Sequence, residues 1–171
     1  ELDVLLIFDE VQTGVGRSGR LFAYELYGVE PDIMTLAKGL GGGVPIGAIL
    51  AREEVAEAFK PGDHASTFGG NPLVTAAGIA VLETIFKEDI LKNVEEMGLH
   101  FISNMERLKK LFPNYIKAIR GKGLLLGMEL TGSAQKVVSL CRKKGLLING
   151  LGDKVLRFLP PLTVKKEEID K

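Results

Sequence analysis

The sequence predicts an α/β protein: part of a large, mostly parallel sheet domain, then a long helix, then a small α+β domain. The segment Val4–Phe8 is apolar at every position, which is typical of a strand covered on both faces in a parallel sheet. Residues 89–112 place apolar side chains at helical spacing with charges between them. Short apolar runs separated by turns then follow. We therefore expect three parts, at residues 1–88, 89–112 and 113–171.

Turn residues and helix caps delimit the elements of the first part. Pro31 and Asp32 form a turn signal ahead of one apolar run, and a stretch rich in glycine precedes the next. Asn71 and Pro72 suit the N-cap and the first position of a helix that is apolar almost all round, so we expect this helix to be buried. The expected elements are strands at Ile33–Leu36 and Ile46–Ala51 and helices at Glu53–Phe59 and Leu73–Phe86.

Beyond the long helix, the spacing of turns predicts a small α+β unit. The expected elements are strands at Tyr115–Ile119, Leu124–Leu130, Leu146–Ile148 and Val155–Phe158 and a helix near Ala134–Lys144. Thr163 suits the N-cap of a further helix, and the sequence ends shortly after this predicted helix start. Because the chain lacks an initiator methionine and stops at this helix start, we expect it to be an internal piece of a longer protein.

Charge and cysteine content limit the classes of function. The sequence has 22 Lys and Arg against 22 Asp and Glu, whereas nucleic-acid-binding proteins usually carry a basic surplus. Cys141 is the single cysteine, so no internal disulfide can form. The sequence suggests no metal-binding spacing, and its uncharged stretches are too short or too rich in loop residues to span a bilayer. We expect a cytoplasmic enzyme that binds neither nucleic acid nor a membrane.

The acidic pair Asp9-Glu10 follows the first apolar run, at a position where α/β proteins often carry functional groups. Three interpretations are open. A carboxylate here caps a neighbouring turn, or binds magnesium in a nucleoside-triphosphatase, or faces a cationic cofactor. The second interpretation requires a phosphate-binding GxxxxGK[ST] loop, which this chain does not contain.

Residues 14–19 read GVGRSG, a literal match to the GxGxxG pattern of dinucleotide-binding proteins. That pattern must follow a strand directly and open a helix whose N-terminus faces the pyrophosphate. Here residues 10–14 separate Asp9 from Val15, and the next stretch, Arg20–Tyr27, is short and is stopped by glycine and proline. A surface turn is therefore predicted in preference to a nucleotide site.

Lys38 lies in an unusual setting for a lysine. It follows an apolar run just past a predicted strand end and precedes the glycine-rich segment 39–43. Most lysines simply extend to water. A lysine bonded to pyridoxal phosphate, with a carboxylate partner for the pyridinium nitrogen, is however the usual arrangement around that cofactor. Asp9 and Lys38 supply one residue of each kind, both at strand ends.

Two further segments suggest anion binding. Ser66–Pro72 combines hydroxyl groups, two glycines and a predicted helix N-terminus, whose unpaired N–H groups attract anions; an ordinary capped helix is the alternative. Arg157 is the only cation in the apolar run before Pro160. It either pairs structurally or offers its planar guanidinium to a carboxylate ligand, and spacing alone slightly favours the structural role.

Five segments in this order resemble the class III pyridoxal-phosphate aminotransferases. They are LLIFDEVQTGVGRSG, GVEPDIMTLAKGLGGGVPIGAIL, STFGGNPL, RGKGLLLGMEL and LRFLPPLTV. The resemblance covers essentially all 171 residues. It implies the fold type I of pyridoxal-phosphate-dependent transferases. Residues 1–88 are then the C-terminal part of the large cofactor-binding domain, 89–112 a linking helix and 113–171 an incomplete small C-terminal domain.

The resemblance also implies roles around the cofactor ring. Asp9 pairs with the ring nitrogen and keeps it protonated. Val11 packs on one face of the ring, and Gln12 lies near the ring hydroxyl. Lys38 forms the Schiff base with pyridoxal 5'-phosphate and, once released by the incoming amine, acts as the base that moves a proton between substrate and cofactor.

Further roles implied by the resemblance concern the cofactor phosphate and the substrate. Thr67, with Ser66 beside it, binds the cofactor phosphate of the neighbouring subunit, so that a homodimer shares its active sites. Arg157 holds the carboxylate of the substrate, which reverses the preference from spacing. The main phosphate-binding loop, the ring-stacking aromatic and the residues that select the substrate side chain lie in the family's N-terminal half. Since none of these is in this chain, we expect the 171 residues alone not to transaminate.

The activity implied is a ping-pong transfer of an amino group from N-acetylornithine to 2-oxoglutarate in arginine biosynthesis. Ornithine, succinylornithine or 4-aminobutyrate is the alternative donor within the family. The alternative from another class is a nucleotide-binding ATPase or dehydrogenase module, which rests on LLIFDE and GVGRSG.

Overall fold

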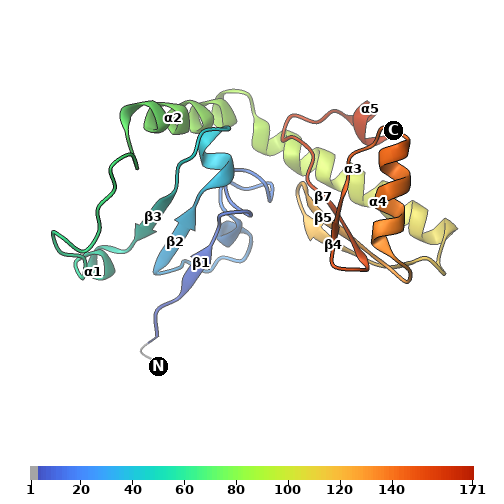
Figure 1. Cartoon of the computed structure of the whole chain (residues 1–171), viewed down its shortest axis with the longest axis horizontal. Coiled ribbons are helices and arrows are strands. Elements are labelled where there is room, and N and C mark those ends of the chain that lie inside the picture. Colours follow the sequence, from blue (N-terminus) through green and yellow to red (C-terminus); the bar gives the residue numbers. More distant parts are fainter. Residues whose placement is uncertain (1–3) are drawn as a thin grey trace. The chain divides into compact units, whose positions relative to one another are not determined.

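A computed structural model describes residues 4–171, which form two compact units (Figure 1). The first unit runs to Leu91 and the second covers Lys92–Lys171. The predicted long helix is α3 (Ile90–Leu111), which from Lys92 onward belongs to the second unit.

The first unit combines a three-stranded sheet with helices. Its elements are β1 (Ile7–Asp9), η1 (Ala23–Leu26), β2 (Ile33–Leu36), η2 (Lys38–Gly41), β3 (Ala48–Ala51), α1 (Glu53–Ala56) and α2 (Pro72–Lys87). The strand order is β1-β2-β3; β1 and β2 are parallel, and β3 is antiparallel to β2. An antiparallel neighbour suits the short connection between β2 and β3, because a parallel neighbour requires a longer crossover. Within the described residues the sheet is therefore mixed.

The prediction that the first strand is covered on both faces is wrong for the described chain. Ile7 is 57% exposed and Val4, Leu5 and Leu6 are exposed as well. The strand itself is only the last part of the apolar run. An uninterrupted apolar run shows that a strand is suited to burial on both faces. In this chain, however, no segment within residues 4–171 packs over these side chains.

Helix α2 is present as predicted, but its predicted burial is wrong. Asn71 is the N-cap, and its side-chain oxygen accepts hydrogen bonds from the N–H groups of Leu73 and Val74. The buried positions form one narrow stripe of Val74, Gly78 and Ile85. The exposed positions include Leu73, Ile79 and Phe86. The buried stripe packs on η2, where a side chain at Gly78 would lie 3.5 Å from the carbonyl oxygen of Leu40.

The second unit contains a four-stranded antiparallel sheet together with α3. Its other elements are β4 (Ile116–Lys122), β5 (Leu125–Leu130), α4 (Ala134–Lys143), β6 (Asn149–Leu151), β7 (Val155–Phe158) and α5 (Lys166–Ile169). The strand order is β4-β5-β7-β6. Alternate residues of β5 are buried, as expected for a strand with one covered face. The core cluster consists of Met105, Ile116, Leu126, Met128, Leu130, Ala134 and Leu156.

Several boundaries in the sequence prediction need correction. The strand expected at Ile46–Ala51 begins at Ala48, and the one expected at Tyr115–Ile119 is Ile116–Lys122. The strand expected at Leu146–Ile148 is β6, which begins only at Asn149, because pairing with β7 sets its register. The last helix is capped by Lys165 and not by Thr163; the Lys165 N–H donates to the carboxylate of Glu168. The helix expected at Glu53–Phe59 ends at Ala56 and continues as turn.

Residues 4–171 contain no candidate for a membrane-spanning helix or for a metal-binding cluster. No helix there combines the length and apolar character that a membrane span requires. No group of three or more His, Cys, Asp or Glu side chains in that range could hold a metal ion.

Candidate functional site

The carboxyl ends of β1 and β2 bring two of the predicted site residues to one edge of the first unit's sheet. Asp9 is the last residue of β1 and pairs in register with Thr35 of β2. Lys38 begins η2, two residues after β2 ends. Because β1 and β2 are parallel neighbours, a carboxylate and an amine lie at the same sheet edge, where α/β proteins bind ligands.

The carboxylate of Asp9 is oriented by two hydrogen bonds to one of its oxygens. Oδ1 accepts from the backbone N–H of Val11 at 3.0 Å and from the hydroxyl of Thr35 at 3.3 Å. Oδ2 has no hydrogen-bond partner among the residues that the structure describes. Asp9 is exposed, so this oxygen can receive a hydrogen bond from a cationic group.

Glu10, the second member of the acidic pair, has a structural role. Its side chain is 2% exposed. Oε2 accepts from the hydroxyl of Thr13 at 2.5 Å, and Oε1 accepts from the backbone N–H of Tyr24 at 2.8 Å. The Glu10 N–H donates to the carbonyl of Thr35 at 3.0 Å. The pair is therefore divided: Glu10 holds the following turn in place, and Asp9 faces outward.

Lys38 combines an exposed side chain with an unusual backbone. Its φ angle is 46°, in the left-handed region that non-glycine residues rarely adopt. Its ammonium forms no ion pair with any residue between 4 and 171. Residues held in such conformations cluster at functional sites, which makes Lys38 the strongest candidate for a nucleophile in the described chain.

The GVGRSG segment is a buried turn, and the prediction of a surface turn is wrong. Val15 is 3% and Ser18 6% exposed. Glycine permits this burial, since a side chain at Gly14 would come within 2.9 Å of the carbonyl oxygen of Glu10 and 3.3 Å of Leu36. Burial lowers the pKa of the Arg17 guanidinium. The turn leads to the four-residue η1 and not to a long helix, so it lacks the helix N-terminus that a dinucleotide site needs.

The Ser66–Asn71 loop is exposed, but its N–H groups are less available than the sequence suggested. The side-chain oxygen of Asn71 already accepts hydrogen bonds from two N–H groups of the helix, those of Leu73 and Val74. The N–H of Gly69 donates to the hydroxyl of Ser66 at 2.8 Å. The expectation of unpaired helix donors is therefore wrong at these positions. Thr67 is exposed, and its hydroxyl has no partner within the described residues.

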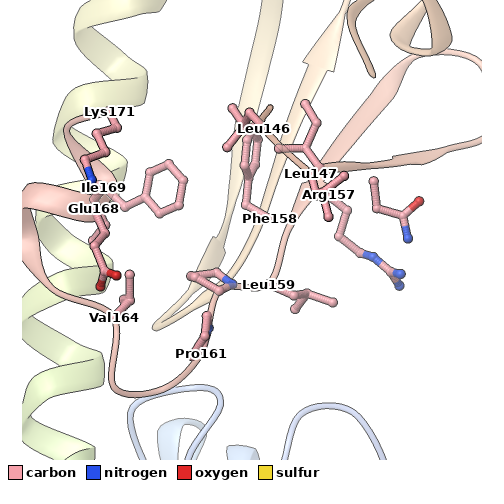
Figure 2. A pocket seen from close by; sticks show the side chains of 14 residues that line it. Leu146, Leu147, Arg157, Phe158, Leu159, Pro161, Val164, Glu168, Ile169 and Lys171 are labelled. Atoms are coloured by element: carbon pink, nitrogen blue, oxygen red, sulfur yellow. The ribbon is translucent and has the colours of Figure 1, made fainter. Parts of the chain in front are cut away.

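Arg157 lies on β7 of the second unit, beside a pocket of about 600 Å³ (Figure 2). Its Nε is buried and has no hydrogen-bond partner in the described chain, which is uncommon for a buried polar group. Figure 2 shows Arg157 at the opposite end of the pocket from Glu168 and Lys171. The pocket wall is mainly apolar and includes Leu146, Leu147, Phe158, Leu159 and Pro161. The arrangement suits a ligand with a carboxylate.

Sequence reasoning missed residues whose role depends on tertiary contacts. Thr35 orients Asp9, and Glu10 secures the turn after β1. The register of two parallel strands could have indicated Thr35, since it lies opposite Asp9. Spacing alone did not distinguish Glu10 from Asp9; only the family resemblance assigned the ring nitrogen to Asp9. Val11 and Gln12 follow Asp9 and are half-buried.

Comparison with known proteins places the chain among aminotransferases. The model of the family described as aminotransferase class III matches residues 1–171. Acetylornithine aminotransferase of Caldanaerobacter subterraneus is 58% identical over 171 residues, which are 99% of this chain and 43% of that protein. The enzyme of that name from Methanocaldococcus jannaschii is 54% identical over 170 residues, 98% of this chain and 42% of that protein.

Solved structures agree with this placement. Acetylornithine aminotransferase from Elizabethkingia anophelis has a TM-score of 0.91 and 37% identity, over 98% of this chain and 43% of that one. Ornithine aminotransferase from Toxoplasma gondii has a TM-score of 0.92 and 40% identity, over 98% of this chain and 41% of that one; its description notes partial occupancy of PLP at the active site. The chain spans about two fifths of the length of these relatives.

Proposed function

The chain belongs to the class III aminotransferase family, and we propose that it supplies the lysine, the ring-nitrogen carboxylate and the substrate-carboxylate arginine of an N-acetylornithine aminotransferase. Class III aminotransferases are pyridoxal-phosphate enzymes, so the family identifies the cofactor. The observation that carries the proposal is that Asp9 and Lys38 lie at one edge of neighbouring parallel strands. The amino acceptor in this proposal is 2-oxoglutarate, the transfer is ping-pong, and the pathway is arginine biosynthesis.

The residues at this edge fit the chemistry of pyridoxal phosphate. The cofactor has an aldehyde, a ring nitrogen and a phosphate, and when bound it supplies the electron sink for amino-group transfer. Lys38 offers the aldehyde a primary amine that forms no ion pair with residues 4–171. Oδ2 of Asp9 is available to the ring N–H. The Thr67 hydroxyl is available to a phosphate.

Lys38 has two functions in the proposed mechanism. Its Nζ would hold the cofactor through the cofactor's aldehyde carbon in the resting enzyme, with loss of water. Once displaced by the substrate amine, Nζ would take a proton from the substrate carbon and deliver it to the cofactor, as a general base and acid must. Its exposed side chain beside glycine 39 leaves room for both positions.

Asp9 maintains the charge on the ring nitrogen. A carboxylate that accepts a hydrogen bond from a cationic N–H stabilises the protonated form. The bonds from Val11 and Thr35 to Oδ1 fix the rotation of the carboxylate, so Oδ2 is oriented before the cofactor arrives. Val11 is proposed to pack on the ring, and Gln12 to lie near its hydroxyl.

The remaining proposed roles involve the phosphate, the substrate and a second subunit. We assign Ser66 and Thr67 to the cofactor phosphate of a neighbouring subunit, which makes the enzyme a homodimer with shared active sites. Ser66 Oγ accepts from the Gly69 N–H, which leaves its own O–H free to donate. Arg157 is assigned to the substrate carboxylate, and its unpaired Nε supports this assignment. A cytoplasmic location follows from the proposed pathway.

The second candidate function is an aminotransferase of the same family with another donor. Ornithine aminotransferases are among the solved structures similar to this chain, whereas several curated relatives at 49–58% identity are acetylornithine aminotransferases. The higher identity favours N-acetylornithine. The nucleotide-binding alternative is overturned by family membership and by the buried turn at residues 14–19.

The proposal is tested by identifying the lysine that binds the cofactor. The full-length protein is saturated with pyridoxal phosphate, reduced with borohydride and digested, and the labelled peptide is identified by mass spectrometry. We expect the label on Lys38 and none there in the Lys38→Ala variant. Label confined to another lysine contradicts the assignment. Rates with N-acetylornithine, ornithine, succinylornithine and 4-aminobutyrate then identify the donor, and the 171-residue chain alone is expected to show no turnover.

A further inference from the structure

Val15 shares an unusual backbone conformation with Lys38. Its φ angle is 54°, in the left-handed region that is especially unfavourable for a β-branched side chain. Only three non-glycine residues in the described chain have positive φ: Val15, Lys38 and Asp89. Of these three, Val15 lies in the turn after β1, and Lys38 is the proposed catalytic lysine. A conformation of this kind persists only where the surrounding structure enforces it.

The two segments lie next to each other. A side chain built on Gly39, the residue after Lys38, would lie 3.5 Å from Cβ and 3.7 Å from Cγ1 of Val15. The side chain of Val15 therefore lies beside the backbone that immediately follows Lys38, close enough to contact a methyl group placed on Gly39. Val15 is 3% exposed, so it fills a buried position and its place is determined by its neighbours.

The turn that carries Val15 is itself attached to β2. The N–H of Gly14 donates to the Glu10 carbonyl at 2.9 Å, and the N–H of Gly16 donates to the Leu21 carbonyl at 3.1 Å. Glu10 adds its bonds to Thr13 and Tyr24 and its N–H bond to Thr35. The buried Glu10 carboxylate, which accepts from Thr13 and Tyr24, is costly to displace. Val15 is thus held from one side by the turn and faces Gly39 on the other.

From these contacts we propose that Val15 is a positioning residue for Lys38: its side chain, held by the Glu10-anchored turn, keeps the backbone of residues 38–39 in the conformation that directs the lysine amine. This inference rests on the proposed function of Lys38. Val15 itself touches neither the cofactor nor the substrate in this proposal. It acts through the backbone that it packs against, which is why the sequence match GVGRSG gave no indication of its role.

The test measures the bond between Lys38 and the cofactor without using turnover. Full-length Val15→Ala is loaded with pyridoxal phosphate, and two quantities are recorded: the pH midpoint of the violet absorbance of the lysine-bound cofactor, and the rate of cofactor release on dilution. We expect the midpoint to move by about half a unit or more, which corresponds to about threefold in the underlying equilibrium, and release to be several-fold faster.

Matched variants separate positioning from a loss of stability. Val15→Thr keeps a branched side chain beside Gly39. We expect its absorbance midpoint and its rate of cofactor release to stay near the wild-type values. Val94→Ala removes the same two methyl groups from a fully buried site of the second unit; it is expected to lower the thermal midpoint but to leave the absorbance midpoint unchanged.

Several outcomes overturn the inference. A Val15→Ala protein with wild-type absorbance midpoint and release rate does so, and so does an equal shift in Val94→Ala. If Val15→Ala does not fold, Val15→Gly decides, since glycine removes the left-handed strain together with the contact; a wild-type midpoint there overturns the inference. If the wild-type protein shows no violet absorbance and no label on Lys38, the proposed function has failed instead.

Discussion

The two units differ in how completely their sheets are covered. In the second unit, alternate residues of β5 are buried, and α3 and α4 contribute Met105 and Ala134 to one contiguous core. In the first unit, β1 leaves Ile7 57% exposed and β3 leaves Ile49 58% exposed, although both strands are apolar. The difference teaches that the sheet of the second unit buries one face in a core of its own, whereas the sheet of the first unit leaves apolar side chains uncovered by residues 4–171.

The largest expected effect compares one apolar side chain from each unit. Leu126→Ala creates a cavity at a position that is 2% exposed and should lower the free energy of unfolding by about 2–5 kcal/mol. Ile49→Ala removes a side chain that is already mostly in water and should cost less than about 1 kcal/mol in the 171-residue chain. Urea unfolding monitored by circular dichroism measures both. An equal loss for Ile49→Ala would show that its face is covered in solution, for instance by a second copy.

The next effect concerns a close backbone contact inside the second unit. A side chain at Gly98 of α3 would lie 2.4 Å from the carbonyl oxygen of Gly123. Gly98→Ala must therefore push the β4–β5 connection away from α3, and we expect a loss of about 1–3 kcal/mol. Gly132→Ala is the matched control, because nothing lies within 4 Å of its built side chain. Thermal unfolding of both variants tests this; similar midpoints would mean that the helix and the connection separate easily.

The smallest effect depends on pH. Hydrogen bonds from His100 and Asn104 lower the pKa of Asp170, and these bonds attach the end of α5 to α3. Because the folded-state pKa is lowered, the stabilisation is present above the unfolded-state pKa of about 3.9 and is lost as pH falls through the folded-state value. We expect Asp170→Asn to show a shallower fall in stability than wild type in this acid range. Identical pH profiles from urea unfolding would contradict this.

Elements with strong local signals could be predicted from the sequence, and burial could not. Val155–Phe158 is found with the predicted bounds, because branched and aromatic residues between turns define a short strand. The cap at Asn71 was equally clear. By contrast, the apolar surface of α2 and of β1 suggested cover that residues 4–171 do not provide. The local pattern of apolar residues indicates which side chains favour burial, but it does not indicate which segment of the fold packs over them.

The candidate site was predictable to a similar extent. Asp9 and Lys38 stood out because each charged group ends or follows an apolar run, and the parallel pairing of β1 and β2 brings their positions to one edge. The burial of Val15 and the hydrogen bonds of Glu10 depend on contacts between the turn and β2, which no spacing reveals. The roles of all the predicted site residues stay predictions: Asp9, Val11, Gln12, Lys38, Ser66, Thr67 and Arg157.

Asp9 is exposed whereas the adjacent Glu10 is buried and anchors a turn, and this difference matters for protein engineering. A designer who grafts Lys38 and its proposed partner carboxylate onto a foreign scaffold would copy Asp9 and omit Glu10, whose carboxylate bonds only to the chain's own Thr13 and Tyr24. Such a graft would lose the anchor of the turn behind the lysine. The minimal transplantable unit is therefore the whole strand–turn–strand segment from β1 to η2, with its inward-facing acid included.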